Sequence, residues 1–225
     1  MGIMLYIFKK IDNTSIKKIQ SFFEDFNSMP KNKFEVKDVE HFSDFIRYTF
    51  VKFFDSYELF YDENTQNLET KKFSRMYSAQ ILILIKFNCI IIFGEKKVCL
   101  SAEKHIFEIS SNTLINWEFT FNQIYNHFSE LEMTISEVTF SNINLLDTSL
   151  NAITLEFHNN FDALKIINKL KKNPISMNFK VFYQKEMCEL GINFISGQIE
   201  LKYESFSRVA LENLEEKILN LIEGE

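Results

Sequence analysis

Phenylalanine dominates the apolar part of this chain, and residues that shape loops are scarce. The sequence holds 25 phenylalanines against five glycines and two prolines. Large apolar side chains are those that a folded interior buries most readily, whereas tight turns need glycine or proline. The chain therefore predicts a large packed core built from regular elements. Its length of 225 residues, 25 % of them charged, is sufficient for one large domain or two small ones.

The glycines are too far apart to build a phosphate-binding turn. They stand at Gly2, Gly94, Gly191, Gly197 and Gly224. P-loop and dinucleotide-binding folds need closely spaced glycines, because their backbone N–H groups must surround the phosphates. Nucleotide enzymes of these two types are therefore not expected.

Charge and cysteine usage indicate a cytoplasmic protein. The formal net charge of −6 argues against unselective binding to nucleic acid, although it leaves room for a local basic face. Cys89, Cys99 and Cys188 are odd in number and form no CxxC pair, which suits a reducing compartment. The apolar residues 81–93 are too few for the roughly 20 that a membrane-spanning helix needs. We also expect no signal peptide at the start of the chain.

The first half of the chain, residues 1–131, predicts a phenylalanine-rich α+β unit. Residues 4–8 indicate a buried strand, followed by an amphipathic helix with apolar residues at positions 16, 19, 23 and 26. Apolar residues between 39 and 53 recur at intervals of three and four and favour a second helix, with residues 49–54 alternatively extended. Residues 57–61 predict a short strand, and residues 62–70 a mobile loop without apolar period.

Two further strands and two helices complete that half. Residues 79–85 and 89–93 are apolar at odd and even positions alike, as expected of strands covered on both faces. Asn88 lies at the turn between them. A short helical segment follows near residues 102–107. Thr120 and Gln123 then fit a capping box at the start of another helix.

The second half, residues 132–225, predicts a compact ββαββα unit. Its strands are expected at residues 135–143, 153–157, 175–183 and 192–203, with a turn over residues 184–191. One helix runs from Asn159 or Asn160 to residue 173, and another begins at Ser205. This order predicts an α+β fold with mainly antiparallel sheet, close to a split βαβ sandwich with both helices on one face. No linker marks the boundary, so the two halves either share one core or form two domains.

The helix over residues 160–173 has a positively charged face. Its apolar residues share one arc: Ala163, Leu164, Ile166, Ile167 and Leu170. Lys165, Lys169 and Lys172 lie opposite, and Lys180 follows on the next strand. These four lysines are the candidate residues for contacting a protein partner or nucleic acid. The alternative, which we favour, is a solvated face offset by the glutamates of the terminal helix.

The strand over residues 175–183 predicts one face toward the helices and one face away from them. Asn178, Lys180 and Phe182 lie on the second face. That face is either open for binding or covered by the phenylalanine-rich first half, and we expect the covered arrangement. The surplus of aromatic residues is mainly core, with room for one hydrophobic docking patch.

Catalytic signals are weak throughout the chain. The four histidines are scattered without the spacing of a helical zinc site, and Ser196-Gly197 lacks the preceding glycine of a nucleophile elbow. A Mg²⁺-dependent nuclease or other phosphoryl-transfer site is the competing hypothesis, with Asp62 and Glu95 holding the metal and Lys97 stabilising phosphate charge. The Glu-x-Lys pattern recurs five times, so each copy carries little information.

The sequence thus favours a non-catalytic intracellular binding or adaptor subunit of a protein complex. We expect a protein partner and name nucleic acid as a second candidate for the lysines. We expect no cofactor unless the Mg²⁺-dependent alternative holds, and no membrane partner.

Overall fold

The computed structural model describes residues 2–25, 34–62, 66–111, 113–145, 148–183 and 186–222. Phe26, the last apolar position of the first predicted helix, lies outside the described residues, and so does the side chain of Asp62. In the described part of the chain, no helix is both long enough and apolar enough to cross a membrane.

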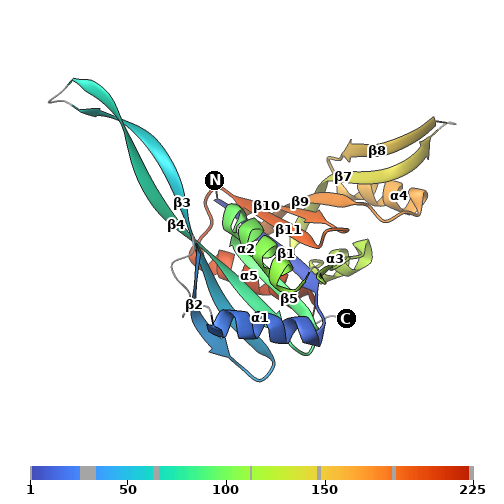
Figure 1. Cartoon of the computed structure of the whole chain (residues 1–225). Coiled ribbons are helices and arrows are strands. Elements are labelled where there is room, and N and C mark those ends of the chain that lie inside the picture. Colours follow the sequence, from blue (N-terminus) through green and yellow to red (C-terminus); the bar gives the residue numbers. More distant parts are fainter. Residues whose placement is uncertain are drawn as a thin grey trace.

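A single antiparallel sheet of 11 strands runs through the described residues (Figure 1). Its order is β2-β3-β4-β5-β1-β11-β10-β9-β7-β8, and β6 pairs with β1. The strands of the first half are β1 (Gly2–Lys10), β2 (Phe34–His41), β3 (Phe45–Asp62), β4 (Asn67–Leu84), β5 (Cys89–Glu95) and β6 (Ile115–Asn116). Those of the second half are β7 (Glu132–Leu145), β8 (Thr148–Glu156), β9 (Ser176–Tyr183), β10 (Glu186–Asn193) and β11 (Gln198–Tyr203). With five α-helices beside this sheet, the predicted α+β, mainly antiparallel class is confirmed.

The helices cover opposite faces of the sheet in its two halves. They are α1 (Asn13–Asp25), α2 (Lys96–Ile109), α3 (Phe121–His127), α4 (Asn160–Leu170) and α5 (Arg208–Leu219), the last followed by a 3-10 turn (Asn220–Ile222). One core packs α1 and α2 against strands β1 to β5, and the other packs α3, α4 and α5 mainly against the strands of the second half. Both helices of the second half therefore lie on one face, as predicted.

Strand β1 joins the two halves. It pairs with β5 on one side and with β11 on the other. Leu5 and Ile7 belong to the first core, and Tyr6 and Phe8 to the second. The expected boundary after residue 131 falls just before β7, and the sheet is continuous across it through the pairing of β1 with β11. The division into two domains or one shared core stays a prediction.

The second helix predicted for the first half is wrong, and its residues form strands β2 and β3. Ile46, Tyr48 and Phe50 are buried against the helices at every second position. The intervals of three and four arise because Phe42 and Phe53, which are 51 % and 40 % exposed, stand three or four residues from buried strand positions. The aromatic and β-branched content of residues 45–54 agrees with a strand.

The predicted loop over residues 62–70 is also wrong from Asn67 onward. Strand β4 begins at Asn67, and every residue of β3 from Phe45 to Asp62 pairs with a residue of β4. The hairpin projects well beyond the body of the molecule, at the upper left of Figure 1. We call residues 53–62 and 67–76 the arm. Its polar residues lack an apolar period because neither face is covered by a helix.

The second half keeps the predicted helices but has one strand more than expected. Residues 186–193 form β10, and the turn lies at residues 194–197. Cys188, Leu190 and Ile192 of β10 are buried on one face, but the polar Glu189 and the glycine Gly191 between them interrupt the apolar run. The crossover from β8 through α4 to β9, with β7 between the two strands, is the predicted split βαβ arrangement.

Local signals at helix ends and turns are confirmed. Thr120 and Gln123 form the capping box of α3, and the Asn159 side chain accepts a hydrogen bond from the backbone N–H of Asp162 at the start of α4. Asn88 ends the turn between β4 and β5 with a positive φ of 50°. Asparagine tolerates this left-handed conformation better than most residues.

Gly197 yields a testable prediction about the junction of the two halves. Its φ is +66°, and an added Cβ would lie 2.5 Å from the carbonyl oxygen of Trp117 and 2.6 Å from that of Phe8. Gly197→Ala is therefore expected to destabilise the fold by about 3 kcal/mol, measured by urea unfolding.

Gly191→Ala is the matched control for this prediction. Its added Cβ would lie 2.9 Å from Oδ1 of Asn178, a movable side-chain atom, and its φ is outside the left-handed region. We expect a cost of about 1 kcal/mol or less. Equal losses in the two variants would contradict the role assigned to Gly197.

Candidate functional site

The arm exposes a large group of apolar side chains. Eight of them are 38–70 % exposed: Phe53, Tyr57, Leu59, Phe60, Tyr61, Leu68, Phe73 and Met76. Four form a stripe at the tip on one face of the ribbon, where Tyr57, Leu59 and Tyr61 alternate along β3 and Leu68 stands opposite Tyr61. We call these four residues the tip stripe, and each is at least 61 % exposed. Contiguous exposed apolar surface of this kind marks interaction sites.

Cross-strand pairs hold the two strands of the arm together. The Lys72 ammonium lies 2.8 Å from a carboxylate oxygen of Asp55, and Arg75 pairs with Glu58. The ring centroids of Phe60 and Phe73 are 5.4 Å apart on the face opposite the tip stripe. Such pairs stabilise a ribbon only modestly, by roughly 0.2–1 kcal/mol each.

Both long edges of the arm lack a neighbouring strand in the described part of the chain. Strand β2 pairs with β3 only as far as Lys52, and β5 pairs with β4 only between Ala79 and Leu84. Backbone N–H and C=O groups along an unpaired edge are able to accept another strand. The arm therefore combines exposed apolar side chains with available backbone hydrogen-bonding groups.

The four candidate lysines do not share one surface. Lys165 and Lys169 are exposed on α4, and Nζ of Lys172 donates hydrogen bonds to the backbone carbonyls of Ser141, at 3.1 Å, and Asn142. Lys180 points to the opposite face of the sheet, because its neighbours Phe179 and Val181 pack in the core beneath α4. Of the four candidates, Lys165 and Lys169 therefore lie side by side on α4, whereas Lys172 is held by backbone carbonyls and Lys180 lies on another face.

The outer face of β9, β10 and β11 is open, so the expected cover by the first half is wrong there. Phe182 is 40 % exposed and Met187 is 51 % exposed. Charges alternate across this open face, with Lys180 opposite Glu189 and Glu189 opposite Lys202. Asn178 donates a hydrogen bond of 3.0 Å to Glu137. A face with alternating charges has no net attraction for phosphate.

The structure does not bring together the residues of the Mg²⁺-dependent alternative. Glu95 precedes α2 at the end of β5, and Lys97 lies in the first turn of that helix. Asp62 pairs with Asn67 at the tip of the arm, twelve residues along β4 from Ala79, which pairs with Gly94. This strand length corresponds to about 40 Å. In the described residues, no three His, Cys, Asp or Glu side chains gather closely enough to hold a metal ion.

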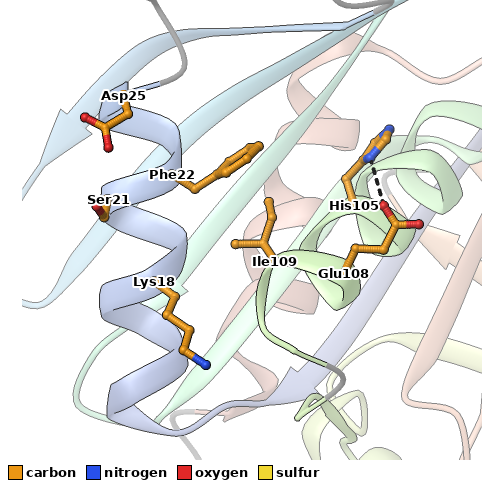
Figure 2. Close-up of a pocket in the computed structure, with 7 residues that line it drawn as sticks. All are labelled: Lys18, Ser21, Phe22, Asp25, His105, Glu108 and Ile109. Carbon is orange, nitrogen blue, oxygen red and sulfur yellow. Dashed lines mark ion pairs between the residues drawn. The ribbon is translucent and has the colours of Figure 1, made fainter. Parts of the chain in front are cut away.

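A groove of about 620 Å³ lies between α1 and α2 (Figure 2). In Figure 2, Phe22 points from α1 toward Ile109 of α2, whereas Ser21 points away from His105. The His105 ring lies 4.3 Å from the ring of Phe34, measured between centroids, and its Nδ1 is 3.6 Å from a carboxylate oxygen of Glu108. Burial and the nearby Lys52 lower the pKa of His105, and Glu108 partly opposes them. This imidazole packs as part of the core edge, and Ser21 is not placed to act with it.

A second hollow, of about 540 Å³, lies between α5 and strands β2 to β4 and is acidic. Asp38, Glu40, Glu212, Glu215 and Glu216 line it together with Arg47. Burial raises the pKa of Glu215, whose carboxyl faces the Tyr6 hydroxyl. The hollow collects negative charge, but it presents no group of ligands for a metal ion among the described residues.

Comparison with known proteins gives no family for this chain. No protein-family model matches it, and no curated protein matches it. The geometry of the described residues therefore carries the functional argument.

The arm is the candidate site, and sequence reasoning found only part of it. The short strand predicted at residues 57–61 belongs to the arm, and room for one hydrophobic docking patch was expected. The signal that was available is the recurrence of Tyr57, Leu59 and Tyr61 at every second position, with the charged Glu58 between the first two. Pairing with Asn67 onward was hidden by the polar composition of residues 62–72.

His105 predicts a specific dependence of stability on pH. Its pKa in the folded protein is lowered, so between that pKa and the ordinary value of about 6.5 the unfolded chain binds the proton more readily. The stability that neutral His105 supports is complete above about pH 6.5 and is lost as the pH falls through the lowered pKa. Other groups near the imidazole are Lys104, Phe34 and Phe50.

We expect wild-type protein to lose more stability than His105→Gln when the pH is lowered from 7.5 to 5. The measurement is the urea midpoint of both proteins at each pH. Carboxylates that titrate in this range contribute equally to both proteins and cancel in the comparison. Equal losses would show that the environment of His105 does not control its protonation.

Proposed function

We propose that this chain is a non-catalytic binding subunit that docks onto a protein partner through the β3–β4 arm. The observation that carries the proposal is the exposure of the tip stripe, whose four large side chains are 61–70 % exposed on a ribbon projecting from the body. Burial of such side chains stabilises an interface by roughly 25 cal/mol for each Å² of apolar surface removed from water. Aromatic residues are also the commonest anchors of protein interfaces.

A protein partner fits the arm better than nucleic acid fits the lysines. Strong electrostatic binding to DNA uses on the order of 6–10 phosphate contacts. Lys165 and Lys169 supply two adjacent cations, while Lys172 is engaged by carbonyl oxygens and Lys180 lies on another face. Nucleic-acid contact through α4 is therefore the weaker candidate, and the experiment below separates the two.

A non-catalytic role agrees with the chemistry of the hollows. In the described residues, the α1–α2 groove presents an imidazole packed against the Phe34 ring, and the acidic hollow presents carboxylates without a metal-binding arrangement. Cys99 and Cys188 are poor nucleophiles, because burial raises the pKa of each thiol to about 12. Buried thiols of this kind support the cytoplasm as the proposed compartment.

The proposal predicts that polar substitutions in the tip stripe abolish partner binding without unfolding the protein. We expect the triple variant Tyr57→Ser, Leu59→Ser, Tyr61→Ser to retain at most about a tenth of the partner, since loss of interface anchors costs roughly 2 kcal/mol or more. The measurement is quantitative co-purification from nuclease-treated native lysate that also contains an untagged copy of the chain. The circular dichroism spectrum of the variant should match that of wild type.

The matched control is Lys165→Glu with Lys169→Glu, two exposed positions on α4. This variant is expected to retain the partner at the wild-type level. Loss of the partner in the lysine variant, with retention in the tip-stripe variant, would move the binding site to α4 and contradict the role of the arm.

A further inference from the structure

We propose that a hollow beside α2 binds a small organic acid, whose carboxylate is held by the Lys9 ammonium and whose apolar body packs against α2. The hollow has a volume of about 300 Å³ and lies where α2, the end of β1 and β6 meet. None of its lining residues belongs to the arm. The inference therefore goes beyond the proposed function and does not depend on it.

One wall of the hollow is a flank of α2. It is formed by Leu100, Glu103, Lys104 and Phe107, whose spacing of three and four places them on one face of the helix. The side of α2 that packs in the first core is formed by other residues. Leu100 and Phe107 are 43 % and 41 % exposed, so the flank presents two large apolar side chains to the hollow.

The floor of the hollow is formed where β1 and β6 pair. Lys9 stands opposite Asn116 in this pairing, so their side chains lie on the same face of the sheet. Leu5 and Ile7, at alternate positions before Lys9, belong to the core that α2 covers. Lys9 therefore points to the α2 side as well. Leu114, just before β6, adds an apolar contact.

Lys9 supplies a buried positive charge with one donor to spare. Its side chain is 9 % exposed, and its ammonium lies 2.6 Å from a carboxylate oxygen of Glu103 and 2.6 Å from Oδ1 of Asn116. An ammonium has three N–H donors, and these two contacts use two of them. The third has no acceptor among the described residues. A buried donor without an acceptor is costly, so this N–H favours a ligand oxygen that reaches it through the hollow.

The charges around the hollow favour a ligand with one negative charge. Lys9 and Lys104 each carry one positive charge and Glu103 carries one negative charge, so the lining has a net charge of +1. A carboxylate neutralises this charge, whereas a cation increases it and a doubly charged phosphate reverses it. Asn116 adds a neutral donor, because its Oδ1 accepts from Lys9 and its amide N–H groups are left for the ligand.

The rest of the lining and the size of the hollow define the body of the ligand. Leu100, Phe107 and Leu114 are apolar, so they favour a hydrocarbon chain or ring beside the carboxylate. The volume is at the lower end of the range for ligand pockets. The ligand class is therefore an aliphatic or aromatic monocarboxylate of roughly four to ten carbon atoms.

The first test compares 3-phenylpropionate with its neutral amide, 3-phenylpropanamide, on the full-length protein. The two probes share one apolar body and differ in charge at the other end. In a ¹H–¹⁵N NMR titration we expect the acid to bind with a dissociation constant of about 1 mM or lower. The amide is expected to bind at least about tenfold more weakly, because it lacks the charged hydrogen bonds. Butanoate, hexanoate and octanoate should bind more tightly as the chain lengthens.

The amide signals that shift in this titration locate the ligand. We expect the largest changes at Leu100, Phe107 and Asn116. Phe107→Ser removes part of the apolar wall and is expected to weaken binding of the acid about tenfold. Phe161→Ser is the matched control, because Phe161 is 75 % exposed on α4, away from the hollow. This variant should keep the wild-type affinity.

A double variant isolates the Lys9 ammonium. Lys9→Met with Glu103→Leu replaces the buried ion pair by apolar side chains of similar size, a change that folded proteins often tolerate. Its preference for the acid over the amide is expected to fall to about threefold or less. Lys104→Gln changes an exposed residue, so it tests the charge requirement even if the double variant does not fold. We expect it to weaken binding of the acid about threefold and to leave that of the amide unchanged.

Each part of the inference has an outcome that overturns it. Equal binding of the acid and the amide to wild type, or an undiminished preference in the folded double variant, would overturn the role of Lys9. Signal changes confined to residues outside α2, β1 and β6 would overturn the hollow as the location. Failure of all four acids to show saturable binding up to about 10 mM would overturn the site itself. The tip-stripe experiment reads out a different surface, so these outcomes leave the proposed function untouched.

Discussion

Strand β1 is the element on which the rest of the structure depends, because both cores are built on its two faces. Leu5, Tyr6, Ile7 and Phe8 are all at most 2 % exposed. Successive side chains of a strand point to opposite faces, so these four consecutive residues contribute to two cores at once. A strand covered on both faces has to be apolar at every position, which explains its lack of alternation.

The backbone of β1 also receives contacts from both halves of the chain. The N–H of Phe8 donates to the carbonyl of Gly197, and the carbonyl of Phe8 accepts from the N–H of Trp117. At the end of the strand, the buried Lys9 ammonium lies 2.6 Å from both Glu103 and Asn116. A buried cation is tolerated only when it is paired in this way. The second half therefore docks on a strand whose backbone N–H and carbonyl at Phe8 are both hydrogen-bonded, and the close approach at Gly197 follows from that crowding.

The sequence predicts the parts of the fold whose signals are local. It fails for strands whose surroundings remove the usual alternation of apolar and polar residues. The capping box at Thr120 and Gln123 and the turn at Asn88 depend on neighbouring residues alone, so they are found correctly. The prediction for residues 39–53 fails because the exposed Phe42 and Phe53 combine with the buried Ile46 and Phe50 into a spacing of three and four that imitates a helix. In the arm neither face of the ribbon is covered by a helix. Polar and apolar residues are therefore mixed on both faces, and no strand pattern is visible in the sequence of residues 67–76. The arm as a candidate site could not be predicted, since its shape depends on the pairing of β3 with β4 across 18 residues of each strand.

The arm and the open face of the second half both neutralise their charges within the sheet. Across β9, β10 and β11 the charges alternate from strand to strand, so Lys180, Glu189 and Lys202 neutralise one another within the face. In the arm the ion pairs run across the ribbon, from Lys72 to Asp55 and from Arg75 to Glu58. The tip stripe is what distinguishes the arm, because its four large side chains are at least 61 % exposed, against 40 % for Phe182 and 51 % for Met187 on the open face. The ion pairs hold β3 to β4, and the exposed apolar surface that they support is what a partner would bury.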